Sequence, residues 1–203
     1  MHGRAWSREE AIEALETPER LAGRSAERLW DRLALSEGAT VADIGAGTGY
    51  FALPAARRVG AHGRVYAIDL SAELVALMGE RAQKEGLRQF VSVQNTTESI
   101  PLPSAIADLV LLANVLHDFP PATIRESVRL LKPNGRLINL DWKKEETPGG
   151  PPVGIRFSPD EAAQVLGSHG LLEVERWEMG RWHYALALVR SERSGASQSS
   201  SAP

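Results

Sequence analysis

Three glycines at alternate positions follow a short apolar run and carry no Cβ that would keep a ligand away from the backbone N–H groups. They are Gly45, Gly47 and Gly49 in the stretch 43–49, Asp-Ile-Gly-Ala-Gly-Thr-Gly. The apolar run 40–44 is typical of a buried strand, and a helical pattern over 51–59 comes next. Because a helix presents its positive end at its N-terminus, the stretch predicts a ligand site at a strand-to-helix turn.

Two carboxylates narrow the kind of ligand. Asp69 ends the next predicted strand, 64–70, at about the spacing (roughly 20 residues) of an acid that accepts hydrogen bonds from ribose hydroxyls. Asp43 would repel a pyrophosphate but suit an ammonium group. The dinucleotide fingerprint also needs a third glycine, where this chain has Tyr50. These features favour a nucleoside with an ammonium group, such as S-adenosylmethionine; the alternatives are a buried structural acid at Asp43 and a helix cap at Asp69.

Four motifs in this order resemble those of the class I S-adenosylmethionine-dependent methyltransferases, over about residues 20–190. They are 41–49 (Val-Ala-Asp-Ile-Gly-Ala-Gly-Thr-Gly), 65–69 (Val-Tyr-Ala-Ile-Asp), 111–118 (Leu-Leu-Ala-Asn-Val-Leu-His-Asp) and 130–137 (Leu-Leu-Lys-Pro-Asn-Gly-Arg-Leu). The chain is most similar to small bacterial and archaeal members near the quinone C-methyltransferases and arsenite methyltransferases. It has no cysteine, however, and arsenite methyltransferases work through cysteine thiolates.

The resemblance implies an enzyme with S-adenosylmethionine as cofactor and assigns further contacts. Leu70 would lie against the adenine ring. The family often places an acid after the third strand to bind the adenine amino group, but Thr96 stands there, so the Thr96 hydroxyl or the Thr97 amide would replace it, or Glu98 would shift in. Asn114 resembles the residue that contacts the methionyl end, and an ordinary turn asparagine is the alternative.

A methyl group on a sulfonium is already electrophilic, so such an enzyme chiefly orients its acceptor, and a base is needed only if the acceptor carries a proton. His117, with a reference pKa near 6.5, is the candidate base or else orients the loop after the fourth strand. Asp141 would orient the substrate or pair with Lys143. Asp118 would cap the next helix. Lys143 and Lys144 would attract an acidic substrate or form a solvated loop. No cluster of ligands indicates a metal site.

Strands and helices alternate along most of the chain, which predicts an α/β fold with a doubly wound, mostly parallel, seven-stranded sheet. A C-terminal hairpin supplies one antiparallel strand. The strands are expected at 40–44, 64–70, 90–93, 107–113, 136–142, 171–178 and 181–189. We expect a helical cap over 1–37, a cofactor-binding core over 38–190 and a disordered tail over 191–203. The cap would contain a capping box at Ser7 and a second helix start at Thr17.

Composition limits the partners. The net charge is only −3, so nothing indicates nucleic acid as a partner, and no apolar run approaches the roughly 20 residues that span a bilayer. With no signal peptide apparent, we expect a cytoplasmic protein that acts on a small-molecule methyl acceptor and is able to form a homodimer. The alternatives are an NAD(P)-dependent oxidoreductase and a non-catalytic S-adenosylmethionine-binding protein. The long glycine- and proline-rich loop 143–157 is expected to cover the substrate pocket.

Overall fold

A single mixed sheet forms the centre of the computed structural model, which describes residues 6–16 and 25–191. The expected helix start at Thr17 and nearly all of the expected tail lie outside these residues. The sheet has seven strands in the order β3-β2-β1-β4-β5-β7-β6. In chain order the strands are β1 (Thr40–Ile44), β2 (Arg64–Asp69), β3 (Phe90–Gln94), β4 (Ala107–Ala113), β5 (Leu131–Trp142), β6 (Leu171–Met179) and β7 (His183–Arg190).

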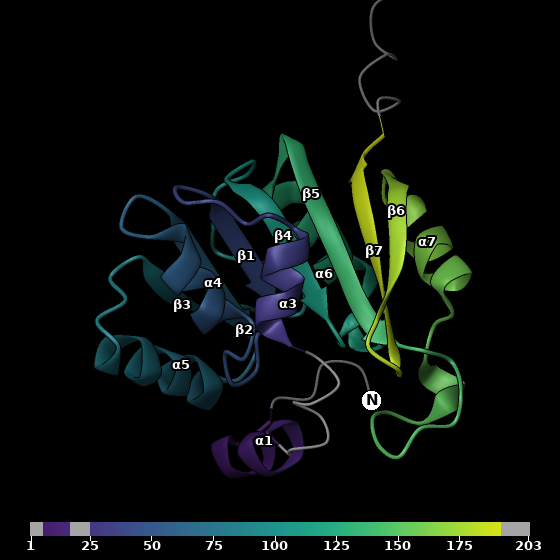
Figure 1. Cartoon of the computed structure of the whole chain (residues 1–203), viewed down its shortest axis with the longest axis horizontal. Coiled ribbons are helices and arrows are strands. Elements are labelled where there is room, and N and C mark those ends of the chain that lie inside the picture. The colour runs from purple at the N-terminus through teal and green to yellow at the C-terminus, as the bar shows by residue number, and fades with distance from the viewer. Residues whose placement is uncertain (1–5, 17–24, 192–203) are drawn as a thin grey trace, which may run out of the picture.

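The direction of the strands confirms the predicted topology. β1 pairs in parallel with β2 and β4, and the parallel pairing extends to β3 on one side and β5 on the other. β7 runs antiparallel to both of its neighbours, β5 and β6, as the short connection from β6 requires. Figure 1 shows the parallel strands ending together at the lower edge of the sheet. This shared edge is where a doubly wound sheet places its ligand.

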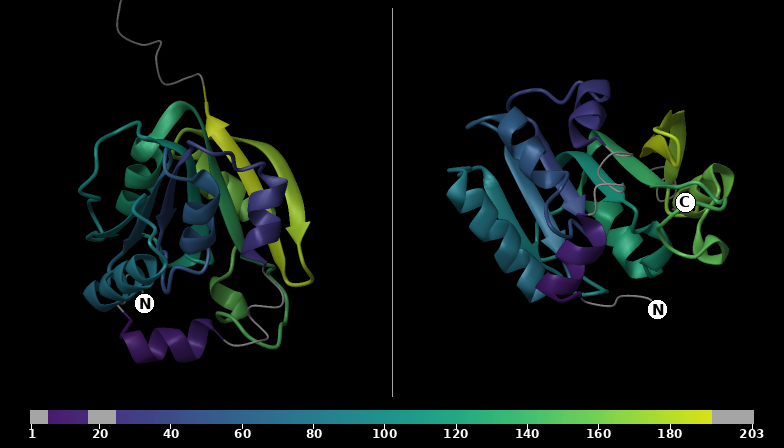
Figure 2. Two further views of the ribbon diagram at one scale, coloured as in Figure 1. Left: turned by 60° about the vertical axis from the view of Figure 1, so that its left-hand side comes forward. Right: turned by 60° about the horizontal axis from the view of Figure 1, so that its bottom comes forward.

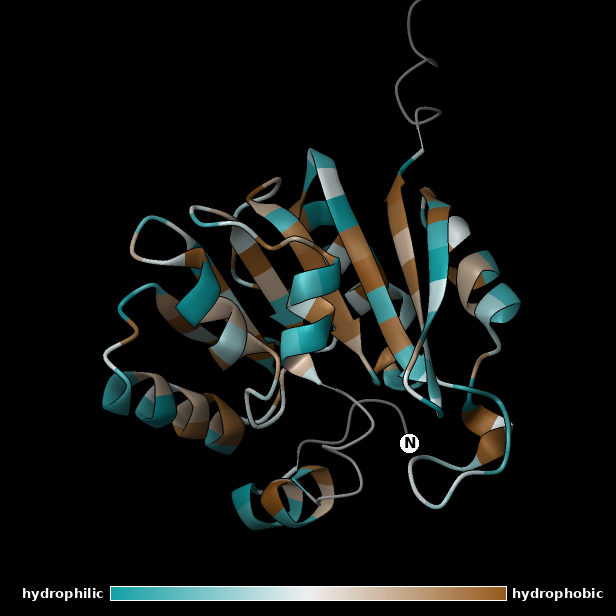
Figure 3. Ribbon diagram, viewed as in Figure 1, coloured by the Kyte–Doolittle hydropathy of each residue, from teal (hydrophilic) through white to brown (hydrophobic). Residues whose placement is uncertain are grey.

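Helices cover both faces of the sheet (Figure 2). They are α1 (Arg8–Leu15), α3 (Ala26–Arg32), α4 (Ala52–Val59), α5 (Ala72–Lys84), α6 (Pro121–Leu130) and α7 (Pro159–Gly167), with short 3-10 turns η1 (Leu116–Asp118) and η2 (Val153–Ile155). Buried residues of α3, α4 and α5 share one apolar cluster with one face of the sheet, and those of α6 and α7 share another with the opposite face. The central strands are therefore buried on both sides and strongly apolar, as Figure 3 shows.

The start of β5 differs from the sequence expectation. A strand was expected over 136–142, after the Pro-Asn-Gly stretch 133–135, whereas β5 begins at Leu131, directly after α6. Leu131 pairs with Ala107, and regular pairing resumes only between Leu109 and Arg136. The stretch is therefore accommodated as an irregularity within the strand, because the first residue after the helix already finds a backbone partner on β4.

The helix α1 packs against α5 beside the lower edge of the sheet (Figure 1). The predicted capping box at Ser7 is confirmed. Apolar side chains of the two helices form a small separate cluster. At the far end of α1, Arg81 pairs with Glu16 and also donates to the Thr48 carbonyl at 2.9 Å. The helix is thereby attached to the glycine loop. Within the described residues, no helix combines the length and apolar character needed to cross a membrane.

Candidate active site

The glycine loop after β1 is attached to the end of β2 by backbone hydrogen bonds. The N–H groups of Gly45 and Ala46 donate to the carbonyl of Ile68 at 2.8 and 2.9 Å. Gly45 has φ +72°, and a Cβ there would lie 2.8 Å from a side-chain methyl of Val115. Only glycine meets both conditions without displacing the loop, so this position is fixed by conformation and by space.

A cavity of about 350 Å³ opens beside this loop at the carboxyl ends of β1, β2 and β4. That volume is within the range of small-molecule sites, roughly 300–1,000 Å³. Its wall contains residues from the loop, from the ends of three strands, from α1 and from the loop 143–157. The residues that line the wall include Trp6, Leu15, Asp43, Gly45, Gly47, Asp69, Leu70, Asn95, Thr97, Asn114, His117, Asp118, Gly150, Pro151 and Ile155.

Asp69 connects the glycine loop after β1 with the turn between β2 and α5. Its Oδ2 accepts from the N–H of Gly47 at 2.9 Å, and its Oδ1 accepts from the N–H of Ser71 at 3.0 Å. Burial raises the pKa of Asp69, and the N–H donors of Ser71 and Gly47 offset part of that rise. The side chain lines the cavity while it organises the loop. It therefore stands where a ligand hydroxyl would reach it, and the N-cap of α5 is provided by Ser71 itself.

Asp43 is a buried acid without a protein partner for one of its oxygens. The residue is 1% exposed, and its Oδ2 has no hydrogen-bond partner among the described residues. Burial, together with the nearby charge of Asp69, raises the pKa of Asp43 to about 7. A buried carboxylate that lacks a partner is costly unless a proton or a cation compensates it. The observed pairing of an orphaned acid with a glycine cradle fits a ligand that brings an ammonium group.

The cavity brings together most of the predicted cofactor residues. Leu70 and Thr97 reach its wall, and so does Asn114, whose φ of +60° turns the chain sharply after β4. Thr96 does not: its hydroxyl instead accepts from the N–H of Ser99 at 3.0 Å and closes a local turn. Gly49 is also outside the wall. Asn95, which the sequence interpretation did not select, lies in the wall directly after β3.

His117, which lines the cavity, lies next to Asp141, which is outside the cavity wall. The Nδ1 of His117 lies 3.8 Å from the Oδ2 of Asp141, with both side chains almost fully buried. Burial lowers the pKa of His117, but the interaction with the Asp141 carboxylate and the charge of Asp118 outweigh it, so the pKa is raised. The backbone N–H of Trp142 donates to the Oδ1 of Asp141 at 2.8 Å and holds that carboxylate in place. The pair resembles a base with its orienting acid. The distance between Nδ1 of His117 and Oδ2 of Asp141 is slightly longer than that of a hydrogen bond.

The structure contradicts the expected role of Asp118 and decides between the alternatives given for Asp141 and the two lysines. Asp118 does not cap α6, which begins after Pro120 without a side-chain cap; its Oδ2 lies 3.5 Å from the Nε2 of His117. Asp141 does not pair with Lys143, which pairs with Glu178 instead. Lys144 pairs with Glu161, so neither lysine belongs to the cavity wall. Among the described residues, no group of three or more histidine or acidic side chains is placed to hold a metal ion.

Comparison with known proteins identifies the family. A family model described as a methyltransferase domain matches residues 42–139. A crystal structure of a SAM dependent methyltransferase from Aquifex aeolicus is 30% identical and superposes with a TM-score of 0.83, covering 90% of this chain and 98% of that one. The chain therefore belongs to the class I S-adenosylmethionine-dependent methyltransferases. A geranyl diphosphate C-methyltransferase from Streptomyces coelicolor A3(2), 18% identical with a TM-score of 0.69, shows the shared fold alone.

Curated relatives place the chain near the quinone C-methyltransferases. The ubiquinone/menaquinone biosynthesis C-methyltransferase UbiE of Laribacter hongkongensis is 32% identical over 130 residues, which is 60% of this chain and 52% of the relative. The corresponding protein of Pseudomonas putida is 34% identical over 127 residues, covering 58% and 49%. The chain thus spans about half the length of the curated relatives that it matches.

Asp43→Asn tests the orphaned acid. The raised pKa means that the folded protein binds more protons than the unfolded chain between about pH 4 and pH 7, so the stability of the ligand-free protein falls as pH rises through that window. The variant should show a smaller fall, because Asp69, whose pKa is also raised, still contributes to it, and it should be more stable than the natural protein at pH 8. It should also bind S-adenosylhomocysteine less tightly, because the ammonium partner is lost. Urea unfolding at pH 5 and pH 8 and calorimetric titration would show both effects; parallel stability curves would contradict the assignment.

Asp69→Ala should weaken S-adenosylhomocysteine binding by at least about tenfold, because charge-assisted hydrogen bonds are worth roughly 1.5–3 kcal/mol each. Calorimetric titration measures the affinity. Asp108→Ala is the matched control: Asp108 accepts from Lys132 and from the N–H of Thr40 at the opposite edge of the sheet. The control should lose stability but keep affinity. Equal affinity of the Asp69 variant and the natural protein would remove Asp69 from the site.

Proposed function

We propose that the protein transfers the methyl group of S-adenosylmethionine to a small-molecule acceptor that carries a removable proton. One observation carries the proposal: a single cavity contains the glycine loop with its two acids at one side and His117, backed by Asp141, at another. The cofactor contacts and the candidate base therefore face the same enclosed space. Family membership supports the cofactor, and the modest volume of the cavity supports a small acceptor.

The cofactor would be held by residues of the first two strand ends. Asp69 would accept hydrogen bonds from the ribose, Leu70 would lie beside the adenine, and Asp43 with Asn114 would face the methionyl end. The fit rests on the buried, partnerless Oδ2 of Asp43 and on the glycine cradle. When bound, S-adenosylmethionine supplies an electrophilic methyl group. Thr97 and Asn95, which line the same wall, would complete the adenine side.

His117 would hold the proton that leaves the acceptor. Its Nδ1 faces Asp141, so its other ring nitrogen, Nε2, is the one available to the cavity beside Asp118. A neutral imidazole accepts the proton at Nε2, and Asp141 stabilises the resulting imidazolium through Nδ1–H. Asp141 is not one of the residues that line the cavity, and it would act by positioning His117.

The proposal is tested by incubating the protein with methyl-labelled S-adenosylmethionine and a metabolite extract, followed by mass spectrometry of labelled products. Formation of S-adenosylhomocysteine together with one labelled small molecule is the expected result. Tight cofactor binding without any S-adenosylhomocysteine would instead indicate a non-catalytic binding protein. Binding of NADH but not of S-adenosylmethionine, followed by tryptophan fluorescence, would indicate an oxidoreductase.

The pH dependence of transfer should report the His117–Asp141 pair. Because His117 must be neutral to accept a proton, the rate should rise with pH through a pKa above the usual value near 6.5. In Asp141→Asn the raising interaction is lost, so the rising limb should move to lower pH and the plateau rate should fall. His117→Asn should lose the limb altogether. A limb that stays in place in Asp141→Asn would show that Asp141 does not act on His117.

A further inference from the structure

The loop 143–157 is organised around one buried guanidinium. Arg156 is only 4% exposed, and all of its nitrogens donate to acceptors within the loop itself. They donate to the carbonyls of Lys143, Glu145, Gly149 and Pro151 and to the hydroxyl of Thr147, at 2.8–3.2 Å. Apart from the short η2 turn, the loop has no regular secondary structure that would satisfy these carbonyls. The Arg156 side chain therefore supplies the hydrogen bonds to the loop carbonyls that neighbouring backbone N–H groups supply in a helix or a sheet.

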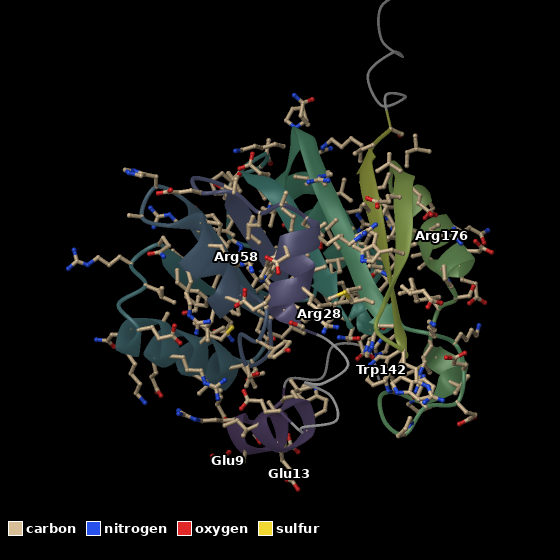
Figure 4. All side chains as sticks on the ribbon, in the orientation of Figure 1. Glu9, Glu13, Arg28, Arg58, Trp142 and Arg176 are labelled. Carbon is tan, nitrogen blue, oxygen red and sulfur yellow. The ribbon has the colours of Figure 1, made fainter. Side chains whose placement is uncertain are left out.

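The same guanidinium fixes the loop to the end of β5. Arg156 lies over the ring of Trp142, with 5.2 Å between the guanidinium carbon and the ring centroid. Gly150 approaches that ring from the loop, with φ +93°, and a Cβ there would lie 2.6 Å from a ring carbon. Figure 4 shows Trp142 at the lower end of β5, beside this loop. The position of the loop is thus set by the close contact between Gly150 and the ring of Trp142. Alanine at position 150 would not fit this contact, and a loop held less firmly would lose it.

The part of the loop that Arg156 holds forms one wall of the cavity. Gly150, Pro151 and Ile155 line it. Gly150 lies against Trp142, the neighbour of Asp141, and the carboxylate of Asp141 lies 3.8 Å from His117. The glycine loop and the N-terminal segment, which contributes Trp6 and Leu15, line the same cavity. The loop begins directly after Trp142, two residues beyond Asp141, the residue that would position the candidate base.

We propose that Arg156 is a positioning residue that shapes the acceptor side of the cavity, through the loop 143–157, without contributing to the cofactor side. This inference rests on the proposed methyl transfer. A lysine cannot replace it: its single ammonium has three donors on a flexible stem, whereas the planar guanidinium presents five in fixed directions. The net charge would be the same after Arg156→Lys, so a loss would come from geometry rather than from charge.

The test compares Arg156→Lys with Arg176→Lys, in the full chain. Arg176 lies on β6, and its ion pairs with described residues, Glu173 and Asp160, lie outside the cavity wall. With labelled S-adenosylmethionine and a dilution series of one metabolite extract as acceptor source, half-maximal transfer by the Arg156 variant should need roughly 10- to 100-fold more extract. Half-saturation by S-adenosylmethionine should change by less than about twofold. The Arg176 variant should match the natural protein in both.

A second pair of variants acts on the loop without touching Arg156. Gly150→Ala should push the loop away from Trp142 and give the same raised extract requirement. Gly154→Ala is its control, because a Cβ at Gly154 meets nothing within 4 Å and its backbone needs no unusual conformation. Hydrogen exchange adds a readout that needs no acceptor: amides over 143–157 should exchange faster in Arg156→Lys, while those of β1 and β2 stay protected.

Each outcome decides between the inference and the function on which it rests. An unchanged extract requirement and unchanged exchange in Arg156→Lys would overturn the positioning role. So would an equal fall in affinity for S-adenosylhomocysteine, measured by calorimetry, because Arg156 would then support the whole cavity. Failure of the natural protein to bind S-adenosylhomocysteine would overturn the proposed function instead. Restored transfer in Arg156→Ala on addition of low concentrations of free guanidinium would support the role directly.

Discussion

The attachment of the glycine loop to the end of β2 is the constraint on which the rest of the site depends. Gly45 and Ala46 donate to the carbonyl of Ile68, and Gly47 donates to the next side chain, Asp69. These bonds can form only if β1 and β2 keep their register, because a shift of one residue would turn Asp69 to the other face of the sheet. The apolar packing on both faces of the sheet fixes that register. The core thus sets the position of a polar site.

The site keeps polar groups that a purely structural solution would have paired or replaced. Asp43 is buried near a second acid, and the side chain of Asn114 finds no partner among the described residues although its polar atoms are buried. Such groups reduce the stability of the ligand-free protein. They cluster at the carboxyl ends of β1 and β4, where the two halves of the sheet diverge. Binding of a ligand explains why these partnerless polar groups are kept, and the surrounding apolar core supplies enough stability to tolerate them.

Local backbone chemistry made the fold and the cofactor side readable from the sequence. The capping box predicted at Ser7 starts α1, and the spacing of glycines and acids places one cavity at two strand ends. Predictions that depended on where a side chain points were weaker. Thr96 closes a turn while its neighbour Asn95 faces the cavity, and Asp118 turns towards His117 instead of α6. In an irregular segment, a shift of one position along the chain changes which side chain faces a ligand. Such segments have no periodic pattern from which that side chain could be predicted.

The two sides of the cavity are built by different means, and this explains why the acceptor is not evident from the sequence. The cofactor side is held by backbone N–H groups and strand register, which require only glycines and two acids and so leave a recognisable motif. The acceptor side is held by Arg156, whose partners are mostly carbonyls that any residue could supply. Residues between those carbonyls are free to vary without loss of the loop. A loop of this kind can change the shape of its wall while keeping its position, so the acceptor is determined by side chains that the scaffold does not constrain.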